Sequence, residues 1–441
     1  MIPSGIEPCL IGLIRHPIEL PSQTASPLAF PMNETTSKQA RFSLMMLLQF
    51  FTRGAWFVTL GTYLGKGLEQ PGEFVGFSYS LFGVAAIISP FFVGMVADRF
   101  FPTDRVLGAL NIGSGLLMLL LSRVTDPTTF VWTLFAYCIV YTPTEALSNS
   151  IVFHHLPRKF FAYIRVFGTI GWVLAGLSVN VLLGMFVDNV EATSVPLLMS
   201  AGASVVLGLY NFTLPSTPIK DKGKKTGFKD VIGIDALKLA KEPNFAVFLG
   251  ACLLIGIPIQ MYFAFFNMFL NDIGVEHVAS KMTLGQVSEA AFMVFVPWMI
   301  GRVGLKWMMT LGLAFWSLRY FLFAGISVDA QFLILFSILI HGACYDFFNV
   351  TGSIYVDLKA GERYRGAAQG LFMLVFLGIG KFFGSNLAGF IASIHQEDGV
   401  GTQYNWSGIF NTTGIITAII TILFIIWFRD KKKYDLNKVD G

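Results

Sequence analysis

Seven charged side chains stand within long apolar stretches of this chain, where a charge is costly to keep. They comprise four cations and three acids: Arg53, Arg165, Arg319, Lys381, Glu145, Glu289 and Asp346. A charge at the centre of a membrane helix costs about 3 kcal/mol on insertion scales, so such residues tend to pair or to serve a site. Ion pairs that only hold helices together are the alternative for any one of them. Seven in one bundle exceed what structure normally requires.

Polar residues at helical spacing define two candidate binding faces. Gln286 and Glu289 are three residues apart and therefore share a helix face. An amide and a carboxylate side by side form a good receptor for vicinal hydroxyl groups. Arg165, Thr169 and Trp172 follow the spacing i, i+4, i+7 and also share a face. Together the two faces predict a site for a polar solute.

Aromatic residues accompany polar residues in two further segments. Pro258 is expected to kink or loosen the helix that carries Gln260 and Phe263. His341 and Tyr345 are i, i+4 neighbours. A flat aromatic solute could stack on such rings while amides and acids hold its polar edge. Aromatic residues at this spacing are more often packing residues, which is the alternative interpretation.

The elements that must position these residues are membrane helices. Of the 441 residues, 54% are hydrophobic and only 13% are charged, whereas a soluble protein carries about 25% charged residues. The composition excludes an ordinary cytosolic enzyme, a nucleic-acid binder and a disordered chain. Long apolar runs predict twelve spans, at 42–64, 74–97, 106–122, 129–153, 164–187, 194–213, 244–270, 282–300, 307–326, 330–356, 366–394 and 405–428.

The basic residues predict the orientation of these spans. On this map 24 of the 31 basic residues lie on one side, in the two tails and in the loops after even-numbered spans. Three lie in the opposite loops and four lie within spans. Because Lys and Arg accumulate in cytoplasmic loops, both termini should be cytoplasmic. Helical spans rather than β-hairpin strands favour the cell (inner) membrane.

The predicted organisation is two six-helix halves, 42–213 and 244–428, joined by a basic cytoplasmic linker at 214–243. A cytoplasmic tail follows at 429–441. Residues 1–41 form a cytoplasmic N-terminal segment, expected to be disordered or to lie upstream of the true start, with Met32 as the candidate initiator. Charges around the short apolar run in this segment are in the wrong order for a signal peptide.

Six plus six helices with a basic central loop resemble the major facilitator superfamily. Such proteins pair two six-helix halves about an axis along the membrane normal. A local motif between the second and third spans resembles the superfamily signature and implies a cytoplasmic gate formed by Gly94, Asp98, Arg99 and Arg105. Residues 301–306 resemble its degenerate second copy, with ordinary positive-inside charge as the alternative. The resemblance implies an all-α integral membrane fold with twelve transmembrane helices.

Several segments of the chain resemble the nucleoside:proton symporter family of this superfamily. The resemblance covers about residues 43–427, and it is carried by residues 48–56, 164–171, 286–289, 316–319 and 346–353. The last segment, DFFNVTGS, is the most specific, because it is not a generic membrane pattern. The resemblance implies a secondary active transporter that imports nucleosides with protons through alternating access. The alternative is transport of another small polar solute, a nucleobase, sugar or organic ion, with sodium as the rival coupling ion.

The same resemblance implies roles for individual positions. Residues that match nucleoside-binding positions of the family are Arg165, Thr169, Gln260, Gln286 and Glu289, with Trp172 and Tyr345 standing where aromatic residues are expected. Two further binding positions depart from the family. Phe263 stands in place of an asparagine, and His341 in place of a tyrosine. These departures leave the base preference open.

Proton coupling requires a buried acid, and the candidates are Asp346 and Glu289. Asp346 matches a family position, and Arg319 is the expected partner of Asp346 across spans 9 and 10. His341 could take part in protonation, although a hydrogen-bonded imidazole facing the substrate is the preferred interpretation.

Three charged residues occur where the family has uncharged ones. They are Arg53, Glu145 and Lys381. Glu145 follows Pro143, which is expected to bend its helix. We expect Glu145 to pair with Arg53 or Lys381.

The chain is not expected to be an enzyme or to bind a metal or a cofactor. His154 and His155 are adjacent and do not share a helix face, so they make a poor metal site. Neither a Ser/His/Asp grouping nor a phosphate loop is evident, and the linker is too short for a receptor domain. The expected partners are a nucleoside, protons and the lipid bilayer, without nucleic acid, and the protein is expected to be a monomer. Free thiols are expected at Cys9, Cys138, Cys252 and Cys344.

Overall fold

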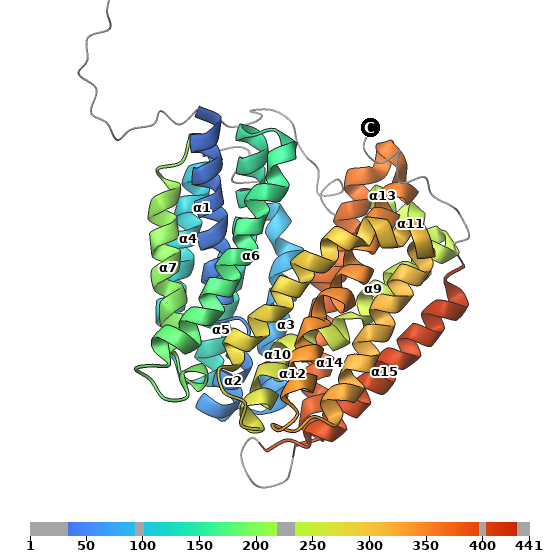
Figure 1. The fold of residues 1–441 in the computed structure, drawn as a ribbon. Coiled ribbons are helices and arrows are strands. Elements are labelled where there is room, and N and C mark those ends of the chain that lie inside the picture. Colours follow the sequence, from blue (N-terminus) through green and yellow to red (C-terminus); the bar gives the residue numbers. More distant parts are fainter. Residues whose placement is uncertain (1–33, 93–100, 218–233, 397–402, 430–441) are drawn as a thin grey trace, which may run out of the picture.

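The computed structural model describes residues 34–92, 101–217, 234–396 and 403–429, and these fold almost entirely into helices (Figure 1). The N-terminal half, residues 34–217, contains α1 (Glu34–Gly54), α2 (Leu60–Thr62), α3 (Gly72–Phe92), α4 (Thr103–Leu121), α5 (Pro127–His155), α6 (Phe161–Leu177) and α7 (Val195–Asn211). The C-terminal half, residues 234–429, contains α9 (Pro243–Leu254), α10 (Gly256–Asp272), α11 (Val278–Ala324), α12 (Gln331–Leu339), α13 (His341–Met373), α14 (Gly380–Ile394) and α15 (Trp406–Trp427).

Each of the twelve predicted spans overlaps one or more of these helices. Within the described ranges, eight helical runs are long and apolar enough to cross a membrane by length and composition. This number is smaller than twelve partly because α11 continues from one predicted span into the next. The all-helical membrane fold is therefore confirmed, while the number of crossings stays a prediction.

Two long helices turn at a single glycine. Gly304 in α11 has φ 81° and ψ 162°, and Gly361 in α13 has φ 61° and ψ 178°. Only glycine adopts such positive φ values without strain. No heavy atom lies within 4 Å of the position that a Cβ would occupy at either residue. Backbone conformation rather than space therefore requires glycine at these two turns.

The first helix begins earlier than the sequence predicted. Helix α1 begins at Glu34, inside the segment 1–41 that was expected to be a disordered tail. An acid in the first turn of a helix is favourable because the N-terminal end of the helix dipole is positive. Residues 1–33 with Met32, residues 218–233 of the linker and the tail from 430 lie outside the described residues.

The outer surface of the helices carries large apolar side chains. Phe332 of α12, Val294 of α11 and Trp132 of α5 are 77%, 76% and 66% exposed. Such extensive apolar exposure is unusual for a soluble monomer. It fits helices whose outer faces contact lipid.

The two halves approach each other through small residues. In Figure 1 the N-terminal half lies on the left and the C-terminal half on the right, with α6 beside α11. A Cβ at Gly76 of α3 would meet the backbone of Gly389 on α14. Likewise, a Cβ at Gly61 of α2 would meet the carbonyl group of Ala264 on α10. Small residues permit this close approach between membrane helices.

A buried carboxylate also joins the halves at one end. Glu191, which is 4% exposed, accepts hydrogen bonds from Asn180 Nδ2 at 2.6 Å, Asn271 Nδ2 at 2.9 Å and Ala279 N at 2.8 Å. Ser280 N donates to Asn180 Oδ1 at 2.7 Å. We refer to these five residues as the Glu191 junction. It lies at the end of the molecule where the sequence predicts extracellular loops.

Candidate functional site

Arg165 on α6 links the two halves electrostatically. Its guanidinium lies 3.9 Å from the centre of the Phe50 ring on α1. The side chain is half-buried and lies within electrostatic range of Glu145 on α5 and Glu289 on α11. Thr169 and Trp172 follow on the same helix and are also half-buried. The predicted face of α6 therefore stands near acids from both halves.

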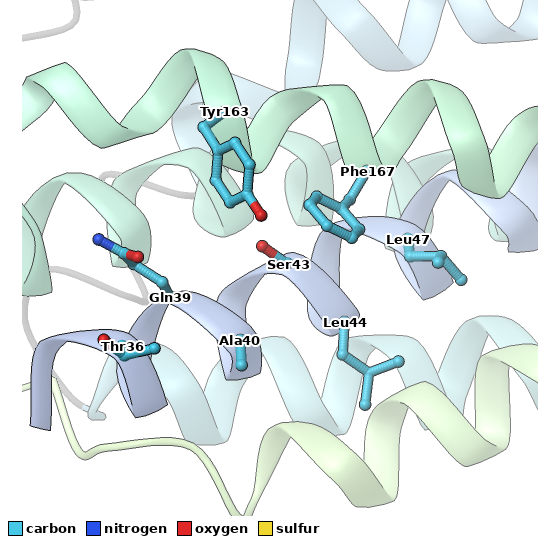
Figure 2. A pocket seen from close by; sticks show the side chains of 8 residues that line it. All are labelled: Thr36, Gln39, Ala40, Ser43, Leu44, Leu47, Tyr163 and Phe167. Atoms are coloured by element: carbon cyan, nitrogen blue, oxygen red, sulfur yellow. The ribbon is translucent and has the colours of Figure 1, made fainter. Parts of the chain in front are cut away.

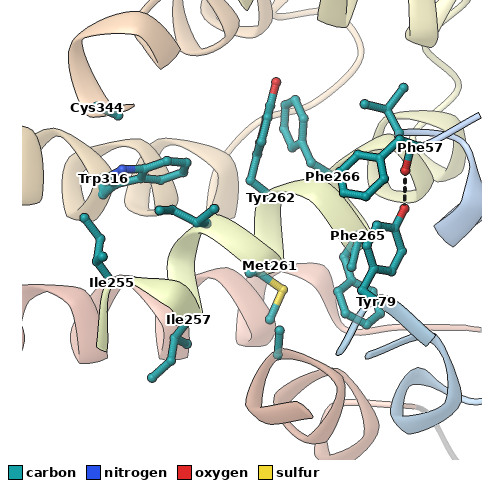
Figure 3. Packing of buried hydrophobic residues seen from close by; sticks show 14 of the residues in the cluster. Phe57, Tyr79, Ile255, Ile257, Met261, Tyr262, Phe265, Phe266, Trp316 and Cys344 are labelled. Carbon is teal, nitrogen blue, oxygen red and sulfur yellow. Dashed lines mark hydrogen bonds between the residues drawn. The ribbon is translucent and has the colours of Figure 1, made fainter. Parts of the chain in front are cut away.

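Phe57 forms the centre of an aromatic group that the sequence did not predict. It lies in the turn between α1 and α2, and its carbonyl oxygen accepts a hydrogen bond from Tyr79 Oη at 2.5 Å (Figure 3). Its ring centre lies 6.2 Å from that of Trp172 and 5.5 Å from that of Phe263 on α10. Phe57 thus brings together two predicted substrate-binding residues from different halves. In the sequence, Phe57 follows Arg53 by four residues, and this spacing could have indicated that the two side chains are neighbours.

The predicted acidic face lies on α11 and meets α13. Gln286 and Glu289 are both half-buried. Between them, Ser288 Oγ accepts a hydrogen bond from Gly342 N at 3.0 Å, which fixes α11 against α13. Asp346 on α13 is fully buried and within electrostatic range of Glu289. Neither carboxylate oxygen of Asp346 has a hydrogen-bond partner among the described residues.

The predicted pairing of Arg319 with Asp346 is wrong. Arg319 Nη1 instead lies 2.9 Å from His341 Nδ1. Its guanidinium carbon lies 4.0 Å from the centre of the Tyr262 ring and 5.4 Å from that of Trp316. A planar guanidinium is well suited to stacking on aromatic faces, so this cation is held without a carboxylate. We call Arg319, His341, Tyr262 and Trp316 the Arg319 cage.

Three predicted site residues have neighbours within the C-terminal half, and one of them, His341, belongs to the cage. His341 is fully buried, and its ring centre lies 4.7 Å from that of Tyr262. Tyr345 is half-buried and stacks on His341 with ring centres 6.0 Å apart. Gln260 is 4% exposed, and its Oε1 accepts a hydrogen bond from Ser385 Oγ at 3.3 Å. His341 and Gln260 therefore have protein partners, whereas Tyr345 remains partly accessible.

The three charged departures from the family form one cluster. Arg53 Nη1 donates to Glu145 Oε1 at 2.5 Å, which confirms the expectation that Glu145 pairs with a nearby cation. The Lys381 ammonium lies 4.8 Å from the centre of the Phe57 ring and 4.9 Å from that of Phe82. The Arg53 guanidinium lies 4.6 Å and 5.6 Å from the same two rings. We call these five residues the Arg53 cluster.

Most of the predicted cytoplasmic gate lies outside the described residues, namely Gly94, Asp98 and Arg99. Arg105 is exposed in the first turn of α4. Its neighbour Asp104 is buried and accepts a hydrogen bond from Thr217 N at 2.8 Å. The start of α4 is therefore tied to the segment after α7.

A pocket of about 290 Å³ lies elsewhere, between α1 and α6 (Figure 2). Across it, the Tyr163 side chain points toward Ser43. None of the predicted site residues lines this pocket. It is therefore separate from the aromatic group at Phe57.

Three of the four cysteines lie among the described residues. Cys138, Cys252 and Cys344 are buried free thiols, as expected, and Cys9 lies outside the described residues. In the described part of the chain, no group of three His, Cys, Asp or Glu residues could hold a metal ion.

Comparison with known proteins assigns the chain to a family. The family described as "Nucleoside H+ symporter" matches residues 36–433. The chain belongs to the nucleoside H+ symporter family. It is therefore a transporter rather than an enzyme.

Relatives of this family member resemble it along nearly the whole chain. It is 40% identical to the protein YegT of Escherichia coli (strain K12), over 89% of this chain and 94% of that protein. It is 31% identical to the xanthosine permease of the same organism, over 90% and 97% of the two chains. The crystal structure of the nucleoside transporter NupG matches with a TM-score of 0.80 and 27% identity, over 90% of this chain and 99% of that one. The fold is that of the major facilitator superfamily.

Proposed function

We propose that the protein imports nucleosides together with protons, by alternating access of its two halves around a central site. The observation that carries this proposal is the aromatic group at Phe57, which joins Trp172 of one half to Phe263 of the other. Beside it, Arg165 lies within electrostatic range of Glu289 across the boundary between the halves. Membership of the nucleoside H+ symporter family supports this choice of solute.

The proposed binding mode assigns the two parts of a nucleoside to different surfaces. The flat base stacks on the rings of Trp172 and Phe263, because aromatic faces hold a planar solute without demanding one hydrogen-bond pattern. The Gln286 amide and the Glu289 carboxylate receive the sugar hydroxyl groups. Arg165 and Thr169 complete the site, and Gln260, His341 and Tyr345 border it from α10 and α13.

The proposed proton site is the carboxylate pair Asp346 and Glu289. Asp346 is buried without a hydrogen-bond partner among the described residues and lies within electrostatic range of Glu289. Two acids so placed are costly to keep charged in a membrane interior, which favours uptake of a proton. In the Arg319 cage, Arg319 of α11 contacts His341 of α13, and this contact positions the two helices that carry Glu289 and Asp346. Sodium is the alternative coupling ion.

In alternating access, the Glu191 junction would be the contact that closes the extracellular side of the central site. We place it at the extracellular end, with both termini in the cytoplasm and the protein in the cell (inner) membrane. The junction must open to admit substrate, and the gate at Asp98, Arg99 and Arg105 must then open to release it. The monomer is the proposed transporting unit.

The test is uptake of radiolabelled uridine, adenosine and xanthosine into proteoliposomes, with an inward proton gradient, an inward sodium gradient or none. We expect accumulation driven by the proton gradient and lost in Glu289→Ala. The matched control is Glu276→Ala, which removes an exposed acid of the same half. Uptake driven only by sodium would overturn proton coupling. Absence of uptake for all three solutes, with folded protein, would overturn nucleoside transport and direct the search to nucleobases and sugars.

A further inference from the structure

We propose that the preferred substrates are nucleosides that carry a negative charge, and that Lys381 and Arg53 hold this charge. The inference rests on the nucleoside transport proposed above and narrows its substrate class. It starts from the Arg53 cluster, which brings two cations and a single acid together.

Lys381 is the cation of the Arg53 cluster that has no counter-ion among the described residues. The residue is 8% exposed, and no hydrogen-bond acceptor or carboxylate contacts its ammonium among the described residues. Its electrostatic neighbours are Arg53, Glu145 and Cys138. Glu145 is the single acid of this group, and Arg53 already binds it at 2.5 Å. When Lys381 is protonated, the cluster therefore has one positive charge in excess at a place where an unpaired charge is costly.

The excess charge stands next to the proposed base-binding surface. The Phe57 ring contacts Lys381 and Arg53 and also contacts Trp172 and Phe263. A base stacked on these rings would thus reach the two cations at its edge. The carboxylate that receives the sugar, Glu289, lies on α11, whereas Lys381 lies on α14 and Arg53 on α1. The site therefore has a cationic side and an acidic side.

Accessibility agrees with a role in ligand binding. The side chains of Arg53, in the last turn of α1, and of Glu145, within α5, are 19% and 30% exposed. An anionic group on the base, such as a carboxylate or an ionised ring oxygen, would supply the missing counter-charge. It would bind Lys381 and the Arg53 Nε, which has no hydrogen-bond partner among the described residues. A neutral nucleoside would leave the excess charge unpaired.

The test uses two pairs of solutes that differ in charge. Uptake in proteoliposomes is measured for uridine against orotidine, which carries a carboxylate on its base, and for inosine against xanthosine, whose base ionises readily. We expect wild-type protein to favour the anionic member of each pair. Lys381→Met should weaken apparent affinity for orotidine about tenfold relative to that for uridine, the size of one charge-assisted hydrogen bond. Lys381→Arg should retain the preference.

Two further variants keep the test interpretable. Lys306→Met neutralises another cation of the same half, one whose Nζ donates to the carbonyl oxygen of Ile425, and should leave the preference unchanged. Glu145→Gln adds to the positive excess and should raise the preference for orotidine, which no general loss of folding would do. An opposite change would overturn the inference.

The remaining outcomes separate this inference from the function on which it rests. Uptake of uridine and inosine with no preference for the anionic solutes would overturn the anion site and leave nucleoside transport standing. An equal loss of both solutes in Lys381→Met would also overturn it, because Lys381 would then serve structure or coupling. Failure of every nucleoside would overturn the proposed function and the inference together.

Discussion

The Arg319 cage and the Arg53 cluster both place a cation over aromatic rings, yet they are built differently. Arg319 is fully buried, its partner His341 is neutral when it accepts, and all residues of the cage belong to the C-terminal half. The Arg53 cluster draws on both halves, contains an acid and remains partly exposed. A cation inside one rigid half can be held by rings alone. Arg53, at the boundary between the halves, keeps a charged partner and stays partly accessible.

The largest effect is expected at Asp346, the buried acid that does not pair with Arg319 of the cage. If Asp346 is a proton site rather than the counter-ion of Arg319, then Asp346→Asn should abolish accumulation driven by a proton gradient. Counterflow exchange of nucleoside should persist, because exchange needs no net proton movement. Paired uptake and exchange assays in proteoliposomes measure both. Accumulation that survives the change would remove Asp346 from the coupling site.

Replacing arginine by lysine at both sites should separate stacking from charge. Arg319→Lys loses the ring contacts and the bond to His341, and should destabilise the protein by about 1–2 kcal/mol. Arg53→Lys can still pair with Glu145 and should cost less than about 1 kcal/mol, since the pair is partly exposed. Thermal unfolding of the purified variants in detergent gives the order. Equal losses would show that both sites depend on charge alone.

Removing the acid of the Arg53 cluster should be repaired in part by removing a cation. Glu145→Gln leaves two cations close together, and we expect lower uridine uptake. Adding Lys381→Met should restore part of it, with a coupling of roughly 1 kcal/mol in the double-mutant cycle. Initial uptake rates of the two single variants and the double variant supply the cycle. Strict additivity would mean that the two side chains do not interact.

A smaller effect is expected at the other contact between the halves. Glu191→Gln keeps the size of the side chain but removes the charge that strengthens three hydrogen bonds of the Glu191 junction. The open form should become about two- to fivefold more populated, which corresponds to roughly 0.5–1 kcal/mol. A cysteine at Thr62, labelled with an impermeant reagent, reports the opening. The same labelling rate in both proteins would mean that the junction does not limit access.

The smallest effect should come from Asp126, an exposed acid outside both clusters. The Thr129 hydroxyl and backbone N–H donate to its carboxylate at 2.7 Å and 2.8 Å, and these bonds lower the pKa of Asp126. A carboxyl group whose pKa is lower in the folded protein than in the unfolded protein stabilises the fold at pH values above its unfolded-state pKa. This stabilisation is lost as the pH falls through the folded-state pKa. Asp126→Ala should therefore lower the melting temperature slightly at neutral pH. The difference should disappear in acid.

Helix periodicity predicted which residues share a face of one helix. It did not predict which residues of different helices are in contact. The spans and the face with Gln286 and Glu289 follow from spacing, whereas the pairing of Glu145 with Arg53 or Lys381 was expected because all three residues depart from the family. The partner of Arg319 does not, because spacing fixes the direction of a side chain on its own helix and not the rotation of the next helix. For the same reason the sequence did not predict the Glu191 junction. Its residues come from segments far apart in sequence, and an acid in a loop carries no distinguishing pattern.

The turns at Gly304 and Gly361 limit how the C-terminal half can deform. Each turn is one residue in the left-handed region, so successive membrane crossings follow one another with almost no slack between them. When one of the two helical segments joined at such a glycine moves, the other is expected to move with it. The contacts that α6 makes with α11, and α10 with α2, across the boundary between the halves are then places where movement can occur. The C-terminal half would move largely as one piece during transport.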